Sequence, residues 1–488
     1  MKAQHPLILL NRLKRWRLET VSFVTGFSLL TYELAAARVL APSIGSSTYV
    51  WTGVIGVIIA ALSLGFIIGG RIADRRDRLT DLVWLLLLAS GMAVLTLLGY
   101  QGLLESIVDG VEDSRLQAVT AALLLFAPCS FFIGMTSPYL AKLNVRTLKS
   151  TGQAVASLDS FNAVGGIVGT FMTGFLLFGF IGSHQTIGLV AILLLLASWL
   201  IAPRLYVGKR LIVSAVLLLC ALTPASSLTG QVSIDTASAH YQVFSGIYKE
   251  RLITGLTTGP TGTQSAVYQN GLSDPVFWYA QQMTRLTVDR HPRTILMLGG
   301  GAFTMPQYLS ERLPDARIDV VEIDPQLASI SRQYFNYRDP HSVTATFTDA
   351  RTYVNRSDKR YDVVLVDVYG DTSIPFTFMT KEYGAALAKL LTPDGVVIAN
   401  IIGGLEGKCR DTLAAVDAAY RTSLPHVLYA NESGRPEARA NHVVVYSKQV
   451  VAADGLAPLP DFDAAAYTDD FAPAERLFYD CQQSSKKA

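Results

Sequence analysis

Three carboxylates and a glycine run in the second half of the chain each follow a short apolar run. The run 294–298 is followed by three glycines, Gly299, Gly300 and Gly301. Glycine lets the backbone approach a bound nucleotide closely. Glu322 comes 23 residues after Gly299, a spacing at which an acid accepts both ribose hydroxyls of a nucleoside. Asp349 and Asp367 end the next two runs, so the set predicts a nucleoside site with a carboxylate beside it.

The elements that position these residues alternate between strands and helices. Strands are expected at residues 294–298, 317–323, 343–348, 361–368, 395–402, 427–429 and 443–446, with helical periods between the first five. The central runs are fully apolar, as buried parallel strands are. This pattern predicts a doubly wound, Rossmann-like α/β sheet with its ligand crevice at the carboxyl ends of the strands. Residues 241–271, broken at glycines, predict a small antiparallel β subdomain ahead of it.

The first half has the composition of a membrane domain. Seven apolar runs of 17 or more residues are expected as transmembrane helices near 18–40, 50–72, 82–100, 116–140, 161–181, 184–202 and 211–228. Glu33 and Arg38 interrupt the first run, where an ionisable group needs a partner or a cavity. They are interpreted either as a substrate or ion site or as residues tied to a neighbouring helix and the interface.

The charges of the first half indicate an orientation. Of its 17 basic residues, 15 lie at the N-terminus or in alternate loops, whereas the loop 102–114 is acidic. The positive-inside rule then places the N-terminus in the cytoplasm and predicts a multi-pass protein of the cell (inner) membrane. Seven crossings would leave the second half outside. It would return to the cytoplasm if one of the last three predicted helices failed to cross.

Composition excludes several classes of protein. The two halves, divided at residue 230, carry net charges of +7 and −5, and the acidic balance of the second argues against a nucleic-acid partner. The four cysteines show no CxxC or Cys/His cluster, so no metal site is predicted. Cys129 and Cys220 lie in apolar runs, which leaves Cys409 and Cys481 as the pair that could form a disulfide. An oxidising compartment would favour that disulfide.

At these residues the second half resembles the spermidine synthase (polyamine aminopropyltransferase) family, in the branch fused to an N-terminal multi-pass membrane region. The resemblance covers residues 241–448. Its matching stretches are Tyr241-Gln242, Thr263-Gln264-Ser265, Tyr279, residues 295–301, Val321-Glu322-Ile323-Asp324, Thr348-Asp349-Ala350, residues 361–367 and Ile374-Pro375. The resemblance implies an S-adenosylmethionine methyltransferase-type fold, and the stretches are specific only as a set.

The resemblance also implies roles for individual residues. Gln242 and Glu322 would hold the ribose, Asp349 the adenine amino group, and the glycine turn the nucleoside. Asp367 would face the attacking amine as the catalytic carboxylate. The residues implied to bind the amine substrate are Gln264, Tyr279, Tyr369 and Asp371. The co-substrate would be decarboxylated S-adenosylmethionine, or S-adenosylmethionine itself, with putrescine or a related polyamine as acceptor, no metal, and methylthioadenosine as product.

Two positions depart from the family pattern. Soluble aminopropyltransferases have an Asp directly after the glycine run, which holds the amine of the moving aminopropyl arm, whereas this chain has Ala302 followed by Phe303. After the matched Tyr279 they have Gln or His, and here stands Ala280. Losing one charge-assisted hydrogen bond costs about 1.5–3 kcal/mol. Gln281, Gln282 or a residue of the membrane half is the expected replacement.

Three interpretations follow. The first is a membrane-bound aminopropyltransferase; the second is a methyltransferase or lyase that uses intact S-adenosylmethionine; the third is a transport or sensing protein that binds a nucleoside or polyamine without turnover. The expected domains are residues 1–230 in the lipid bilayer, 231–280 as the β subdomain, 281–450 as the Rossmann-like domain and 451–488 as a C-terminal tail. The family resemblance also makes a homodimer possible through the β subdomain.

Overall fold

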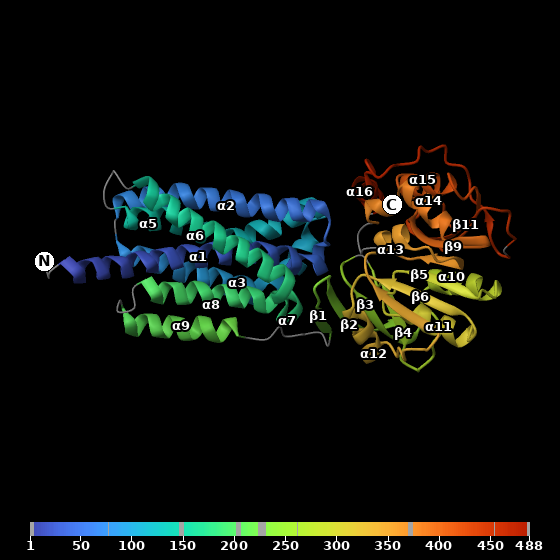
Figure 1. Cartoon of the computed structure of the whole chain (residues 1–488), viewed down its shortest axis with the longest axis horizontal. Helices are drawn as coiled ribbons and strands as arrows, with labels where there is room; N and C mark the ends of the chain where they lie inside the picture. Colours follow the sequence, from blue (N-terminus) through green and yellow to red (C-terminus); the bar gives the residue numbers. More distant parts are fainter. Residues whose placement is uncertain are drawn as a thin grey trace. The chain divides into compact units, whose positions relative to one another are not determined.

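The chain forms two compact units, an N-terminal helical unit and a C-terminal α/β unit (Figure 1). The computed structural model describes residues 4–76, 78–145, 151–201, 206–222, 231–260, 262–368, 374–452 and 454–485. The first unit comprises Met1–Leu228 and Ile234–His240, and the second comprises Thr229–Ser233 and Tyr241–Ala488.

Antiparallel helices build the first unit. They are α1 (Gln4–Ile44), α2 (Thr48–Arg75), α3 (Leu79–Gly110), α4 (Ser114–Ala121), η1 (Ala122–Phe126), α5 (Ala127–Asn144), α6 (Thr151–Met172), η3 (Thr173–Leu177), α7 (Phe178–Phe180), α8 (Gly182–Ile201) and α9 (Val207–Ala221). The segments η1 and η3 are π-helical turns that continue their neighbours, so α4–α5 and α6–α7 each form one long helix.

Six of these helices are long and apolar enough to cross a membrane, at Trp16–Ile44, Thr48–Arg75, Leu79–Gly110, Ser114–Asn144, Thr151–Phe180 and Gly182–Ile201. They match the first six predicted spans. The seventh predicted span, 211–228, falls on α9, which has 15 residues and is followed by residues 223–230 outside the described part of the chain.

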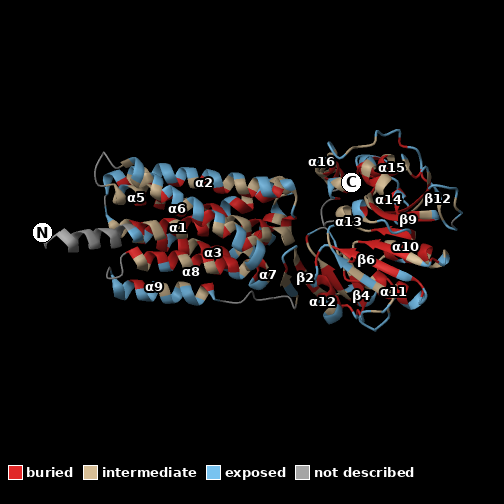
Figure 2. Cartoon of the chain, in the orientation of Figure 1, coloured by how far each residue is buried: buried red, intermediate tan, exposed pale blue. Residues whose placement is uncertain are grey.

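Glycines allow the helices of this unit to pack closely. A Cβ on Gly165 or Gly169 of α6 would collide with the backbone of α1, and a Cβ on Gly65 or Gly69 of α2 would collide with the backbone of α5. Lipid supplies no hydrophobic drive between helices, so close backbone packing has to hold them together. Large apolar side chains such as Ile59, Leu95 and Phe175 are instead exposed on the outside, where a bilayer would cover them (Figure 2).

The strands of the described residues form two sheets. The smaller, in the order β1-β2-β3-β4, comprises β1 (Val232–Asp235), β2 (His240–Tyr248), β3 (Arg251–Thr257) and β4 (Ser265–Tyr268). Strands β2, β3 and β4 pair antiparallel, as predicted for residues 241–271. The larger sheet has the order β12-β10-β11-β9-β8-β5-β6-β7. Its strands are β5 (Thr294–Leu298), β6 (Arg317–Glu322), β7 (Val343–Phe347), β8 (Tyr361–Val366), β9 (Leu391–Gly403), β10 (His426–Asn431), β11 (Ala440–Ser447) and β12 (Ala457–Pro458).

The larger sheet confirms the doubly wound, Rossmann-like prediction. Strands β7, β6, β5, β8 and β9 run parallel, and β11, β10 and β12 add antiparallel pairs at the other edge. All seven predicted strands are present. Strand β9 starts at Leu391 rather than residue 395, because a register shift between Tyr361 and Val363 lets Leu391 pair with Tyr361.

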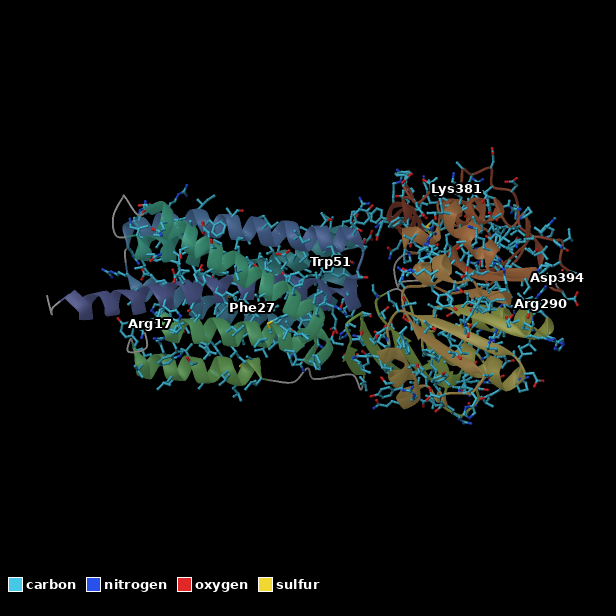
Figure 3. The ribbon with its side chains drawn as sticks, viewed as in Figure 1. Arg17, Phe27, Trp51, Arg290, Lys381 and Asp394 are labelled. Carbon is cyan, nitrogen blue, oxygen red and sulfur yellow. A yellow bond between two sulfur atoms is a disulfide. The ribbon has the colours of Figure 1, made fainter. Side chains whose placement is uncertain are left out.

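Helices between the strands bury both faces of the sheet. They are α10 (Trp278–Asp289), α11 (Thr304–Arg312), α12 (Gln326–Tyr334), α13 (Ala350–Arg356), η4 (Phe376–Phe378), α14 (Lys381–Lys389), α15 (Arg410–Arg421) and α16 (Ala474–Ser485). Arg290, just after α10, and Asp394, near the start of β9, lie side by side, and the Arg290 guanidinium donates to the Asp394 carbonyl at 3.0 Å (Figure 3).

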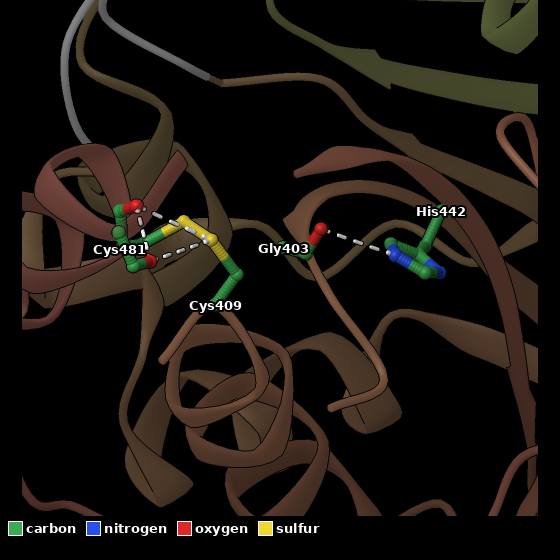
Figure 4. Close-up of a disulfide and its surroundings, with 5 residues drawn as sticks. Gly403, Cys409, His442 and Cys481 are labelled. Atoms are coloured by element: carbon green, nitrogen blue, oxygen red, sulfur yellow. Dashed lines mark hydrogen bonds between the residues drawn. A yellow bond between two sulfur atoms is a disulfide. The ribbon is translucent and has the colours of Figure 1, made fainter. Parts of the chain in front are cut away.

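The residues after 450 fold onto the second unit. Thr380 and Arg351 both bond the Asp469 carboxylate, at 2.6 Å each, and Arg410 donates to the carbonyl of Phe462 at 2.6 Å. A disulfide joins Cys409, just before α15, to Cys481 in α16 (Figure 4). The pair that the sequence left as the candidate bridge is therefore bonded, and Cys129 and Cys220 take no part in this disulfide.

Candidate active site

The carboxyl ends of four adjacent parallel strands bring the predicted residues to one edge of the sheet. Strands β8, β5, β6 and β7 are neighbours, and backbone bonds connect the segments that follow them. The Asp367 amide donates to the Leu298 carbonyl, the Gly299 amide to Val321 and the Thr348 amide to Glu322, each at 2.9 Å. Asp367, the glycine turn, Glu322 and Asp349 therefore follow one another in this order along the edge.

The glycine turn has a backbone that other residues adopt only with strain. Gly299 has φ +88° and Gly301 has φ +51°, both in the left-handed region. A Cβ on Gly299 would overlap the Asp367 carbonyl, and one on Gly301 would lie 2.7 Å from Ser265 Oγ. These glycines thus keep β8 and the β subdomain close to the turn.

Glu322 is buried beneath the glycine turn, and its carboxylate accepts four backbone N–H groups. Oε2 accepts from Gly300 at 2.8 Å and Gly301 at 3.1 Å. Oε1 accepts from Ile323 at 2.7 Å and Asp324 at 3.1 Å. Burial raises the pKa of Glu322 and the four N–H donors oppose that rise. The carboxylate is held rigidly where it could also meet the hydroxyls of a bound sugar.

Asp349 lies after β7 at the start of α13. Its Oδ1 accepts the Thr352 amide at 2.8 Å, so it caps the helix. The cap fixes the side chain at the edge of the sheet next to the strand that carries Glu322. Its structural role and the predicted role toward an adenine amino group are compatible, because a carboxylate has a second oxygen.

Asp367 is the centre of a polar cluster after β8. Its Oδ1 accepts from Asn400 Nδ2 at 3.1 Å. Burial raises the pKa of Asp367 to about 6, and the polar groups of Asn400 and Tyr279 beside it oppose the rise. Burial, together with the negative charge of Asp367, raises the pKa of the Tyr279 hydroxyl well above its usual value. A carboxylate with a pKa near neutrality can exchange a proton under physiological conditions.

The β subdomain contributes the other side of the cluster. The Tyr279 hydroxyl donates to the Gln264 carbonyl at 3.0 Å, and the Gln264 side chain donates to Thr258 Oγ1 at 2.6 Å. Gln242 is half-buried on β2 and pairs with Thr257 of β3, which places it on the subdomain but gives it no contact with Glu322 among the bonds described. Tyr369 and Asp371 lie outside the described residues. Beyond them Ile374 is buried, and the Tyr420 hydroxyl bonds the Phe378 carbonyl at 3.0 Å.

Two polar residues at this edge were given no role from the sequence. Asn400 is 4% exposed on β9, and its Oδ1 has no hydrogen-bond partner among the described residues. An amide inside the apolar run 395–402 was the signal that could have identified it, because a buried amide has to find partners. Ser265 belongs to a matched stretch, and its Oγ accepts the Ala302 amide at 3.1 Å, which ties β4 to the glycine turn.

Comparison with known proteins agrees with this geometry. The family model described as "Spermine/spermidine synthase domain" matches residues 277–402, which include the glycine turn, Glu322, Asp349, Asp367 and Asn400. The C-terminal part of the chain is a spermine/spermidine synthase domain. A polyamine aminopropyltransferase of Vibrio vulnificus is 32% identical over 142 residues, which cover 28% of this chain and 48% of that protein. The chain therefore spans about half the length of this curated relative.

A second relative aligns over more of the chain. The polyamine aminopropyltransferase of Corynebacterium efficiens is 24% identical over 408 residues, covering 78% of this chain and 76% of that protein, so the alignment extends beyond the synthase domain into the helical unit. The crystal structure of a probable spermidine synthase from Corynebacterium glutamicum ATCC 13032 has a TM-score of 0.43 and 20% identity, and covers 51% of this chain and 99% of that one.

Proposed function

We propose that the protein is a membrane-bound polyamine aminopropyltransferase, similar to spermidine synthase. It transfers the aminopropyl group of decarboxylated S-adenosylmethionine to an amine such as putrescine and releases methylthioadenosine. The observation that carries the proposal is Asp367, a half-buried carboxylate with a pKa of about 6 beside the glycine turn and bonded to Asn400. A protein that only binds a nucleoside has no need of a proton acceptor at this point.

The chain's own residues divide the work between the two substrates. Glu322 and Gln242 would hold the ribose, Asp349 the adenine amino group, and the turn at Gly299 the nucleoside. The fit rests on the structure at two points: the turn leaves no room for a Cβ at Gly299, and Glu322 is fixed by backbone donors. The sulfonium co-substrate supplies a carbon activated for attack by its bond to a positively charged sulfur.

Asp367 serves the amine in two ways. An alkyl amine has a pKa near ~10, so it arrives as a cation, and the carboxylate attracts it. One ammonium proton first passes to Asp367, which frees the nitrogen lone pair. The lone pair then forms a bond to the methylene carbon beside the sulfonium, and the carbon–sulfur bond breaks with its electrons going to sulfur. The unpartnered Oδ1 of Asn400 gives the same ammonium a second acceptor.

The position after the glycine turn supports the alternative in which intact S-adenosylmethionine is used. Ala302 is fully buried and its methyl group offers no carboxylate to an aminopropyl amine. The candidate replacements are engaged locally: Gln281 donates to the Pro275 carbonyl at 2.9 Å, and Gln282 accepts from Arg285 at 3.0 Å. A methyl transfer or cleavage reaction needs no partner for that arm.

The test is product identification by mass spectrometry. Full-length protein is incubated with decarboxylated or with intact S-adenosylmethionine, each with and without isotope-labelled putrescine. The proposal predicts a labelled aminopropylated amine from the decarboxylated donor only, and none from the Asp367→Asn variant. A methylated amine, or methylthioadenosine from intact donor without amine, would replace the proposal by the alternative; no product from either donor would favour a binding protein.

A further inference from the structure

The two ends of the helical bundle differ in charge. Arg17 lies at the end where α1 enters the bundle, and Trp51 lies at the opposite end (Figure 3). Because the helices alternate in direction, four other helix termini also lie at the Arg17 end. They are the end of α2, the start of α3, the end of α5 and the start of α9. Basic residues of the sequence gather there, at Arg71, Arg75, Arg76, Arg78, Lys142, Lys209 and Arg210. The acidic segment between α3 and α4 lies at the Trp51 end and contains Glu105, Asp109, Glu112 and Asp113.

Helix α9, with 15 residues, runs from the Arg17 end back toward the Trp51 end. It runs antiparallel to α8. Near its start, Arg210 donates to Ser198 Oγ at 3.3 Å, and one turn later Ser214 Oγ accepts from the Trp199 indole at 2.9 Å. At its end, the Ala221 carbonyl lies 2.6 Å from the place of a Cβ on Gly188. The helix therefore follows α8 from Trp199 back to Gly188, two turns from the start of α8.

The segment after α9 is fastened at the same end. Asp235 accepts from the Ser183 amide at 2.9 Å and from the Ser183 hydroxyl at 3.1 Å, at the start of α8. Arg38, near the end of α1, donates to the Ala237 carbonyl at 2.6 Å. Both contacts lie within the first unit, so residues 234–240 leave the bundle at the end opposite the basic one.

From these contacts we propose that the synthase domain lies on the extracytoplasmic side of the membrane. The basic end faces the cytoplasm by the positive-inside rule, so the end that holds Asp235 faces outward. All the helices long and apolar enough to span a membrane in the described part of the chain lie before residue 202, so the described residues after 240 offer no helix for a return crossing.

The disulfide supports this placement independently of the helices. Cys409 and Cys481 are both buried, are 72 residues apart in sequence, and are joined in the synthase domain. Disulfides persist in oxidising compartments and are rare in the cytosol, where thiols are kept reduced. Cys129 and Cys220, which belong to the helical unit, take no part in this disulfide.

This placement goes beyond the proposed function and constrains it. Polyamines and sulfonium nucleosides are cations, and a cation does not cross the hydrocarbon core unaided. For the proposed transfer, the amine acceptor is therefore taken from the extracytoplasmic side, and the donor must be carried to that side by a separate transport step.

The test is the accessibility of single introduced cysteines to a membrane-impermeant maleimide, which reads topology without activity. Asp74→Cys reports the basic end, Asp109→Cys the opposite end and Asp358→Cys the synthase domain; all three positions are exposed. Each change removes an acid, so the basic residues that set orientation remain. Labelling of the unmodified protein measures the background that comes from Cys129 and Cys220.

The placement predicts that Asp109→Cys and Asp358→Cys are labelled in intact cells, whereas Asp74→Cys is labelled only after permeabilisation. It also predicts that, in acid-quenched cells, Cys409 and Cys481 of the unmodified protein resist alkylation until a reductant is added. Labelling of Asp358→Cys only after permeabilisation, like Asp74→Cys, would overturn the proposal. Two reduced thiols at Cys409 and Cys481 in quenched cells would overturn the assignment to an oxidising compartment.

Discussion

Replacing Asn400 by leucine should move the pH dependence of the reaction. Leu has nearly the shape of Asn but cannot donate to Asp367 Oδ1, the bond that measures 3.1 Å. This bond helps to keep the pKa of Asp367 as low as about 6 against the effect of burial. The substitution also removes the unpartnered buried Oδ1, so we expect no loss of folding.

The size of the shift follows from the strength of the bond. A hydrogen bond to a charged group contributes about 1.5–3 kcal/mol, and one pKa unit corresponds to about 1.4 kcal/mol. The pKa of Asp367 should therefore rise by about 1–2 units. At pH 7 the ionised fraction would fall up to about tenfold, and the rate would fall with it, because only the carboxylate accepts the proton.

The assay is kcat/KM for aminopropyl transfer from pH 5 to pH 9 with one amine for all variants. In Asn400→Leu the acid limb should move to higher pH. The loss of the Oδ1 acceptor for the ammonium lowers kcat/KM at every pH and does not move the limb. Thr412→Val, which changes a buried hydroxyl on α15 that has no partner among the described residues, is the control and should leave the profile in place. An unshifted acid limb in Asn400→Leu would refute the assignment of that limb to Asp367.

Three further predictions concern stability and donor binding. Asp367→Asn should raise the melting temperature at pH 8, because it should increase the free energy of unfolding there by about 1–2 kcal/mol for this partly exposed group. The pKa of Asp367 is raised in the folded state, so its ionisation destabilises the fold above pH 6. The gain in stability should therefore vanish below about pH 4. An equal gain at pH 4 and pH 8 would show that charge is not its cause. Ser265→Ala removes the acceptor of the Ala302 amide and should raise the KM for the donor about tenfold, whereas Ser273→Ala, whose hydroxyl bonds Glu311 instead, should not. Replacing both Cys409 and Cys481 by serine should lower the free energy of unfolding by about 2–4 kcal/mol. The unmodified protein in reductant should have the same melting temperature as this variant. A variant as stable as the oxidised protein would contradict this prediction.

The sequence predicted those parts of the fold that depend on local patterns. The apolar runs that became β5 and β8 are continuous because both faces of a central parallel strand are covered. Since parallel strands end at a common edge, the order of the runs was enough to group the glycine turn with Glu322, Asp349 and Asp367. The six long apolar helices were predicted because a run of about 20 apolar residues is recognisable in the sequence by its length and composition alone.

The remaining features depend on contacts between distant segments, which periodicity does not report. Asn400 reads as one polar residue in an apolar strand, and only the fold brings it to Asp367, 33 positions earlier. The path of α9 is fixed by its contacts with α8, because 15 residues alone do not distinguish a short crossing helix from one at the surface. The fold of the C-terminal tail depends on Asp469 and Cys481, which the sequence did not connect with α13 and α15.

The most direct test of the central claim is the amine-dependent release of methylthioadenosine from decarboxylated S-adenosylmethionine by purified full-length protein, compared between the unmodified chain and Asp367→Asn. Transfer to an amine with Asp367 as proton acceptor predicts release that requires the amine and falls by at least about 100-fold in the variant, as expected for loss of a general base. Release that is independent of the amine, or equal in the two proteins, would contradict it.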